Sequence, residues 1–371
     1  MSPALFRPIH LRELELANRI VVSPMCQYSA DDGTASDWHH IHLPTLAMSG
    51  AALLLVEATA VEAVGRITPG CLGLYSDANE RALAPVVSAV RRYGSAAFGI
   101  QLAHAGRKAS SQAPWDGGKL ILQQDGGWQP VAPSAIAHGA DEPPPHALEK
   151  AEITRIVDRF ADSARRALRL GFDAIELHGA HGYLMHEFLS PIANRRDDEY
   201  GGSLENRMRF PLAVFDAVRA VWPAEKPLGV RLSCADWVEG GWDIEQTVVL
   251  AHELKKRGCD WIDCSGGGIS PQQKIPLGPG YQVPFAERVR RETGIPTIAI
   301  GLITDPHQAE EIVASGKADM IALARGMLYD PRWGWHAAAA LGGTVQAPKQ
   351  YWRSVPREFA KTFANTRIGQ R

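Results

Sequence analysis

The chain has 371 residues, of which 45% are hydrophobic and 22% charged, and this composition excludes a disordered, collagen-like or coiled-coil protein. With 39 Lys and Arg against 41 Asp and Glu, the formal net charge is -2, so no broad attraction to nucleic acid or to anionic lipid is expected. The five cysteines contain no C-x-x-C pair and indicate neither a disulfide framework nor a zinc site. We therefore expect small-molecule partners and a cytoplasmic location.

The N-terminal ten residues lack the basic start and apolar run of a signal peptide. The most apolar stretch, residues 51–61, is interrupted by Glu57 and is too short to span a bilayer. The sequence therefore predicts a soluble protein that does not interact with membranes.

Short apolar runs alternate with segments of helical period along the chain. The predicted strands are residues 19–24, 52–57, 98–103, 174–178, 228–233, 261–264, 297–301 and 320–324. The predicted helices are residues 78–93, 152–170, 204–221, 244–257, 284–292 and 306–314. Glycines follow the helices where a left-handed residue commonly ends a helix, at Gly94, Gly171, Gly258, Gly294 and Gly316.

Eight apolar strands alternating with helices need both faces of their sheet covered, which predicts an α/β fold, a closed (β/α)8 TIM barrel. An open doubly wound sheet is the alternative, but residues 19–26 lack the glycine-rich phosphate loop that commonly follows its first strand. Residues 110–150 show no periodicity and are predicted to be a long loop insertion after the third strand. Residues 342–371 form a C-terminal tail, and the whole chain, 1–371, is predicted to be one domain.

Active sites of such barrels lie where the strands end, and these positions are unusually polar here. Among them are His178, His181 and Tyr183 after the fourth strand. Two histidines three residues apart could bind a metal, but no carboxylate or cysteine completes a ligand set, so no metal is predicted. They could also be structural histidines. We favour a pair of hydrogen-bond donors for a substrate oxygen, with Tyr183 as the proton donor.

Two arginines are candidates for binding an anion. Arg325 follows the eighth strand, where barrels commonly bind phosphate, and a surface salt bridge is the alternative. Gly301 ends the seventh strand and lets backbone approach a ligand closely. Arg231 on the fifth strand points into the barrel mouth, where an unpaired guanidinium needs an anion or an electron-rich ring. Cys26 alone is weak evidence for a nucleophile.

Several longer motifs are distinctive: SPMCQY at 23–28, VEATAV at 56–61, GRIT at 65–68, IQLAHAGRK at 100–108, APSAI at 132–136, ELHGAHGY at 176–183, HEFLSP at 186–191 and DEYGGSLENR at 198–207. At these motifs the sequence resembles the Old Yellow Enzyme family, and Cys26 indicates its thermophilic-like class of NADPH dehydrogenases and xenobiotic reductases. The resemblance extends from about Leu5 to Arg353. It implies an FMN-dependent ene-reductase on a TIM barrel.

The resemblance also implies which residues hold the non-covalent FMN. For the isoalloxazine they are Ser23, Pro24, Met25, Cys26, Ala58, Gln101 and Arg231. For the phosphate they are Gly301, Ala324 and Arg325. Within this set, Arg231 is expected to stabilise the anionic reduced flavin and Cys26 to tune its potential.

For the substrate, the resemblance implies an α,β-unsaturated carbonyl compound whose oxygen is bound by His178 and His181, with Tyr28 on the other side. A hydride passes from flavin N5 to Cβ and a proton from Tyr183 to Cα, and NADPH or NADH reloads the flavin. The resemblance further implies a homodimer or homotetramer in which Arg353 reaches a neighbouring active site. A surface arginine on the tail is the alternative.

Competing functions are an FMN-dependent 2-hydroxy-acid oxidase, a flavin-free aldolase and a ligand-binding barrel without catalysis. An aldolase is expected to place a Schiff-base lysine within a strand, and the eight predicted strands contain none. A ligand-binding barrel has no need of Tyr183 beside two histidines.

Overall fold

In the computed structural model, which describes residues 2–367 and 369, eight parallel strands close into a barrel. Each of them lies where the sequence predicts a strand, so the predicted TIM barrel is confirmed and the open sheet is wrong. In chain order the strands are β3 Ile20–Val22, β4 Leu53–Ala60, β5 Ala97–Ala103, β8 Ala174–Gly179, β9 Leu228–Ser233, β10 Ile262–Ser265, β11 Thr297–Ala299 and β12 Met320–Leu323. Because the strands are parallel, their carboxyl ends meet at one rim.

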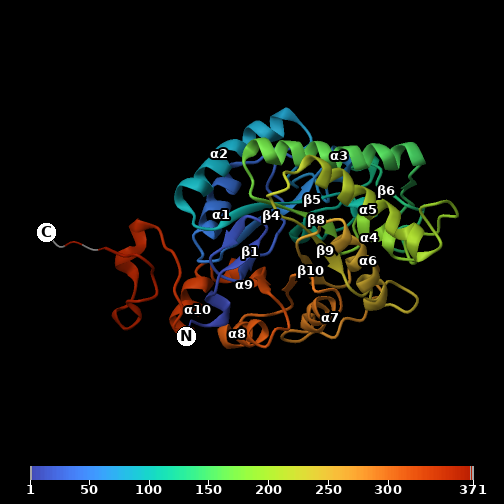
Figure 1. Cartoon of the computed structure of the whole chain (residues 1–371). Helices are drawn as coiled ribbons and strands as arrows, with labels where there is room; N and C mark the ends of the chain where they lie inside the picture. The colour runs from blue at the N-terminus through green and yellow to red at the C-terminus, as the bar shows by residue number, and fades with distance from the viewer. Residues whose placement is uncertain (1, 368, 370–371) are drawn as a thin grey trace.

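The helices surround the barrel (Figure 1). Those that the sequence predicts are α2 Asp77–Tyr93, α3 Lys150–Leu170, α5 Leu204–Val221, α6 Ile244–Lys256, α7 Val283–Thr293 and α8 Pro306–Ala314. Those that it does not predict are α1 Asp37–Ala47, α4 Leu184–Leu189, α9 Arg325–Tyr329 and α10 Trp333–Leu341. Two of these, α4 and α9, are too short to display a helical period.

An antiparallel hairpin of β1 Ile9–Leu11 and β2 Leu14–Leu16 precedes the barrel. Leu11 and Leu16 are buried in one cluster with residues at the start of the barrel strands, such as Leu53. The hairpin therefore closes the amino-terminal end of the barrel, which leaves the carboxyl-terminal rim for a ligand.

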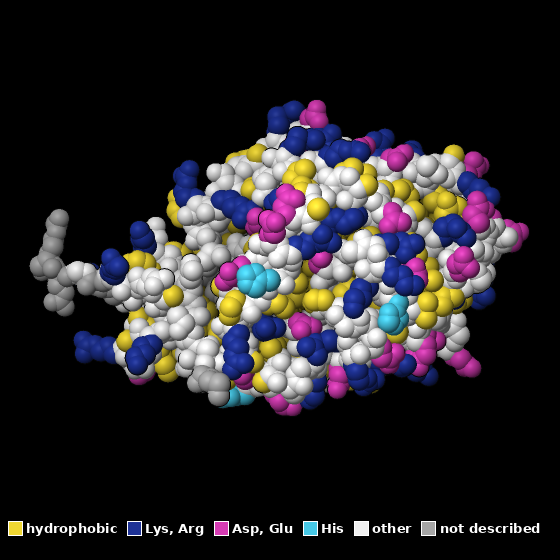
Figure 2. Space-filling model, in the orientation of Figure 1, with side chains coloured by type: hydrophobic (Ala, Val, Ile, Leu, Met, Phe, Trp, Pro, Cys, Tyr) yellow, Lys and Arg dark blue, Asp and Glu magenta, His cyan; other side chains and the backbone are white. Residues whose placement is uncertain are grey.

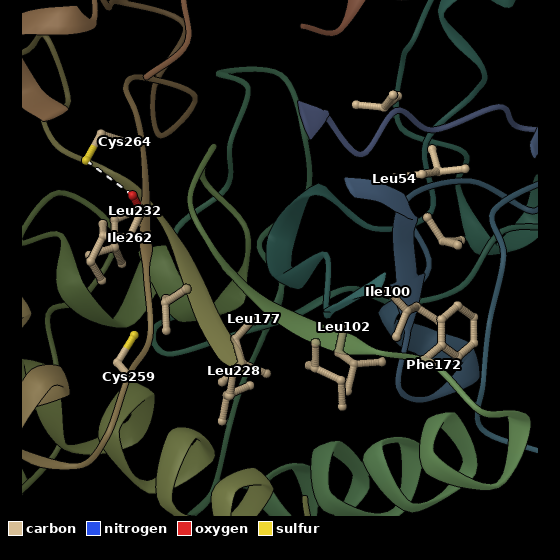
Figure 3. Packing of buried hydrophobic residues seen from close by; sticks show 14 of the residues in the cluster. Leu54, Ile100, Leu102, Phe172, Leu177, Leu228, Leu232, Cys259, Ile262 and Cys264 are labelled. Carbon is tan, nitrogen blue, oxygen red and sulfur yellow. Dashed lines mark hydrogen bonds between the residues drawn. The ribbon is translucent and has the colours of Figure 1, made fainter. Parts of the chain in front are cut away.

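The main core lies between the strands and the helices. Figure 3 shows part of it, where Ile100, Leu102, Leu177 and Leu228 on the strands pack with Phe172. The glycines that follow the helices have the predicted left-handed conformation, with one exception. Gly94 has an extended backbone with φ −83°, so its predicted left-handed conformation is wrong. Here glycine is needed for space, since a Cβ would lie 2.5 Å from that of Ala47.

The predicted loop insertion and the predicted C-terminal tail both contain short stretches of regular structure. The insertion contains the short parallel pair β6 Val131–Ala132 and β7 His146–Ala147. In the tail, a bridge joins Val345 to Phe363, and the Phe363 ring packs edge-on against Trp335 of α10. In Figure 1 this tail extends from α10 away from the barrel.

Positive and negative side chains alternate over the face drawn in Figure 2, in line with the balanced net charge. Among the described residues, no helix is long and apolar enough to cross a membrane.

Candidate active site

A cleft of about 380 Å³ opens at the carboxyl-terminal rim, within the usual volume of a small-molecule site. It is bordered by β9 and by the segments that follow β3, β8, β10, β11 and β12. The predicted site residues that line it are Ser23, His181, Arg231, Gly301, Ala324 and Arg325.

One end of the cleft is suited to an anion. Arg325 is exposed, and no ion pair found among residues 2–367 and 369 involves it, so the surface salt bridge considered from the sequence is not formed. Gly301 has φ +110°, and a Cβ there would lie 3.2 Å from the Gln282 nitrogen. The arginine and the side-chain-free backbone leave room for a phosphate.

Of the predicted site residues after β3 and in β4, Ser23 lines the cleft, whereas Pro24, Met25, Cys26 and Ala58 are not among its lining residues. Ser23 is buried and its Oγ has no hydrogen-bond partner. Pro24 and Met25 are half-buried. The pairing of β4 with β5 shifts register between Val56 and Thr59, an irregularity of the kind that often lies beside active sites and that here includes Ala58.

Cys26 follows Met25 and is half-buried. The neighbouring thiol of Cys71, and next burial, raise the pKa of Cys26 well above its ordinary value. A protonated thiol is a poor nucleophile, so the geometry favours a packing or tuning role over attack on a substrate.

Gln101 and Arg231 occupy the barrel interior beneath the cleft. Gln101 Nε2 donates to Oε1 of Glu176 (2.8 Å), and Trp261 Nε1 donates to its Oε2 (3.1 Å). Arg231 lies 3.3 Å from a carboxylate oxygen of Asp263. The anion that the sequence analysis expects beside Arg231 is thus supplied in part by the protein itself, because β10 places Asp263 next to it.

His178, His181 and Tyr183 are brought together as predicted. The ring centre of His178 lies 5.1 Å from that of His181 and 5.0 Å from that of Tyr183, and both pairs are nearly perpendicular. Because His178 Nδ1 accepts the N–H of Ala180 (3.3 Å), its neutral ring carries the proton on Nε2. One N–H donor and one phenol thus share the same small volume.

His181 has a further partner that the sequence analysis did not include. Its Nε2 lies 2.6 Å from Oγ of Ser265, and Ser265 in turn donates to Gln282 Oε1 (3.4 Å). The Ser265 hydroxyl oxygen therefore accepts a hydrogen bond from the Nε2–H of His181. Ser265 and Asp263 could have been identified from the sequence, because both are polar residues within the otherwise apolar segment that forms β10.

Burial sets the protonation of these groups. It lowers the pKa of both histidines well below the ordinary value, with the charge of Arg231 as the next cause. It raises the pKa of Tyr183 well above its ordinary value. At neutral pH the imidazoles are neutral and the phenol keeps its proton, as donors to a carbonyl oxygen and to a carbanion require.

Lys108, to which the sequence assigned no role, holds the loop that carries His181. Its Nζ donates to the carbonyl oxygens of His181 (2.9 Å) and Gly268 (3.2 Å) and lies 5.0 Å from the ring centre of Tyr183. The Gly182 N–H between the two catalytic candidates is bound by His186 Nδ1 (2.9 Å). Both contacts keep His181 in a left-handed conformation with φ +59°.

The insertion reaches the site through one aromatic side chain. Trp115 packs edge-on against Tyr28, with ring centres 5.5 Å apart. Arg353 lies on the exposed tail, in the 3-10 segment Lys349–Ser354, and is not among the residues that line the cleft of its own chain.

The sequence matches the NADH:flavin oxidoreductase / NADH oxidase family over residues 4–341. It is 48% identical to the NADPH dehydrogenase of Geobacillus thermodenitrificans over 355 residues, which cover 95% of this chain and 99% of the relative. It is 44% identical to the NADPH dehydrogenase of Halalkalibacterium halodurans over 356 residues, with the same two coverages. The solved structure of morphinone reductase superposes with a TM-score of 0.76 at 30% identity, covering 100% of this chain and 99% of that one.

Proposed function

Because the chain belongs to the NADH:flavin oxidoreductase / NADH oxidase family, we propose that it reduces the activated C=C bond of α,β-unsaturated carbonyl compounds. Family membership makes it an NAD(P)H-dependent flavin oxidoreductase that uses FMN, as the resemblance to Old Yellow Enzymes predicts. The observation that carries the proposal is the grouping of His178 and Tyr183 around His181, which lines the same cleft as Arg231 and Arg325.

The residues of the cleft fit FMN. Arg325 and Gly301 offer a phosphate site at one end, and the buried Oγ of Ser23 has no partner within the protein. We propose that Ser23, Pro24, Met25, Cys26, Ala58, Gln101 and Arg231 hold the isoalloxazine and that Gly301, Ala324 and Arg325 hold the phosphate. When bound, FMN supplies hydride transfer from NADPH or NADH to the activated carbon.

The protein groups polarise the alkene and provide the proton. We propose that His178 donates its Nε2–H to the substrate oxygen. We propose that His181 also donates its Nε2–H to that oxygen, and that its hydrogen bond to Ser265 Oγ breaks when the substrate binds. Both imidazoles are neutral, so they bind the oxygen without giving up their protons. Tyr183 keeps its proton at neutral pH, and its hydroxyl donates to no acceptor within residues 2–367 and 369, so that proton is available for Cα. Tyr28, supported by Trp115, closes the opposite side.

The test compares wild type with His178→Ala and Tyr183→Phe, using 2-cyclohexenone under anaerobic conditions. We expect NADPH to bleach the yellow protein and the enone to restore its colour. Both variants should retain FMN, while the enone-dependent step slows by about 10²–10⁴-fold, as is usual when a positioned acid or oxyanion donor is removed. Normal enone turnover in both variants would contradict the assignment. Recovery of colour only with oxygen would favour an oxidase.

The assembly and location follow from the same resemblance. We propose a cytoplasmic homodimer or homotetramer that acts on small enones and related alkenes, without nucleic-acid or membrane partners. The exposed position of Arg353 on a tail that extends from α10 supports contact with a neighbouring subunit.

A further inference from the structure

A buried polar layer lies beneath the cleft, formed by inward-facing residues of four neighbouring strands. Arg231 of β9 and Asp263 of β10 are direct register partners, so their side chains point the same way. Gln101 of β5 and Glu176 of β8 are also direct partners. Asp263 and Glu176 are wholly buried, and Arg231 is only 7% exposed. Two carboxyl groups therefore share the barrel interior with one guanidinium.

The two sides of the Arg231 guanidinium group lie in different surroundings. Its Nε is buried and lies 3.3 Å from Oδ2 of Asp263, while the side chain also lines the cleft. The area that remains exposed therefore belongs to the other end of the side chain. Neither oxygen of Asp263 has a hydrogen-bond partner in the described part of the chain, so the ion pair with Arg231 is the contact that offsets its burial.

The two carboxyl groups differ in their environments. Burial, and next the charge of Asp263, raise the pKa of Glu176 to about 8, so Glu176 is mainly protonated at neutral pH. Burial raises the pKa of Asp263, while the charge of Arg231, 3.3 Å away, opposes that rise and favours the ionised form of Asp263. With Asp263 ionised beside Arg231, the layer is close to neutral, because it holds one ion pair and one protonated acid.

We propose that Asp263 is a positioning residue that holds the Nε edge of Arg231, directs its terminal nitrogens to the cleft and cancels much of its charge, thereby lowering the reduction potential of bound FMN. This inference rests on the proposed binding of FMN beside Arg231. A cation beside the flavin stabilises the reduced, anionic form, so a carboxylate that neutralises the cation works in the opposite direction. Arg231 alone would raise the potential further than the Arg231–Asp263 pair does.

The experiment measures the midpoint potential of FMN in the holoenzyme by anaerobic titration against reference dyes. In Asp263→Asn, reduced FMN should bind at least tenfold more tightly relative to oxidised FMN, a rise of about 30 mV for a two-electron couple. Glu176→Gln is the matched control in the same layer. It replaces a protonated acid by a neutral isostere, so the potential should stay at the wild-type value.

A second comparison separates action through Arg231 from a direct effect of charge. In an Arg231→Gln background, Asp263→Asn should shift the potential much less than it does in wild type. Equal shifts in both backgrounds, or no shift in wild type, would overturn the inference. If Asp263→Asn does not fold, Asp263→Glu serves instead. Its longer side chain should weaken FMN binding at least tenfold, and an unchanged dissociation constant would overturn the positioning role.

Failure of the proposed function gives a different result. If Arg231→Gln bound FMN with wild-type affinity and potential, the placement of FMN beside Arg231 would be wrong, and the inference would fall with it. If Arg231→Gln altered both properties while Asp263→Asn altered neither, only the role of Asp263 would be excluded.

Discussion

Lys108 is a half-buried cation whose acceptors are two backbone carbonyl oxygens, on His181 and Gly268. Burial lowers its pKa to about 8. Such a group costs solvation energy, and its contacts join the backbone at His181 to the backbone at Gly268. A lysine so placed supports the loop that carries His181 and has no need to touch a ligand.

Replacing Lys108 by Met should therefore impair turnover more than cofactor binding. Without the ammonium, His181 is free to leave its left-handed conformation, and a small displacement of a reacting group costs about 10–100-fold in rate. Steady-state kcat with 2-cyclohexenone and the FMN content measure the two effects. Lys119→Met, at an exposed position of the insertion, is the control. Equal kcat in both variants would exclude a role for Lys108.

Glu187 gives a prediction about pH. Burial raises its pKa to about 8 from an ordinary value of 4.5, and its Oε1 accepts the N–H of Arg107 (2.8 Å). Between these pH values the native state binds a proton that the unfolded chain has lost, so the free energy of unfolding falls as pH rises, by up to about 1.4 kcal/mol per pH unit for one proton.

Denaturant unfolding of Glu187→Gln at pH 5.5, 6.5 and 7.5 should show a flatter slope than wild type, since the amide does not titrate. Glu239→Gln, at an exposed position, should keep the wild-type slope. A Glu187→Gln slope equal to that of wild type would show that Glu187 is ionised throughout this range. Glu176 contributes in the same direction, so some slope should persist.

At the level of residues, the sequence predicts which side chains reach the rim but not which of them pair. His178, His181 and Tyr183 follow one strand, so their proximity can be inferred from spacing. The partner of Arg231 could not be inferred, because Asp263 becomes its neighbour only through the register of β9 with β10. The same holds for Ser265 and His181.

Among the elements, the junction of β8, β9 and β10 is packed most tightly around a glycine. A Cβ on Gly229 would lie 2.0 Å from the ring of Trp261, whose Nε1 donates to Glu176. Gly229 is the register partner of Glu176, so the absence of a side chain in β9 makes room for the indole. Glycine weakens the interior of a strand, but at this position it leaves the space that the buried indole of Trp261 occupies.

Gly229→Ala should displace Trp261 and lower the free energy of unfolding by about 1–3 kcal/mol, the usual cost of overpacking. Gly171→Ala is a useful comparison, since it has open space but φ +83° at the end of α3, and should cost about 1 kcal/mol. Chemical denaturation measures both. If Gly229→Ala were as stable as wild type, the indole would have to be mobile in its site.

The barrel strands and long helices were predictable because buried strands are apolar throughout and surface helices carry one apolar face. Helix α1 was not, since it mixes buried with exposed apolar residues such as Ile41. The hairpin β1–β2 was missed because each of its strands buries only one residue, whereas the equally short β3 and β11 are buried throughout. Short elements are defined by what they pack against, and the sequence does not show this.

For the whole molecule, the tail raises the question of how many chains make one active site. Its attachment to α10 through Phe363 and Trp335 leaves residues 349–351, 353 and 354 exposed. Phe363 is only 5% exposed, so the end of the tail is anchored while Arg353 lies on the surface. This arrangement can present Arg353 to a second copy without releasing the tail.

If Arg353 acts in a neighbouring site, two inactive variants should complement each other. His178→Ala lacks a donor in its own cleft, and Arg353→Ala deprives its neighbour, so each homo-oligomer should be impaired. A co-expressed hetero-oligomer, isolated through two different tags, contains one cleft with both residues intact. In a symmetric dimer it should therefore recover about half of the wild-type turnover.

The control pairs His178→Ala with Arg357→Ala. Arg357 is another exposed arginine of the tail, and the Arg357→Ala oligomer should stay active by itself. Turnover of the mixed oligomer equal to the mean of its two parents would instead place Arg353 on the surface without a role in the neighbouring site.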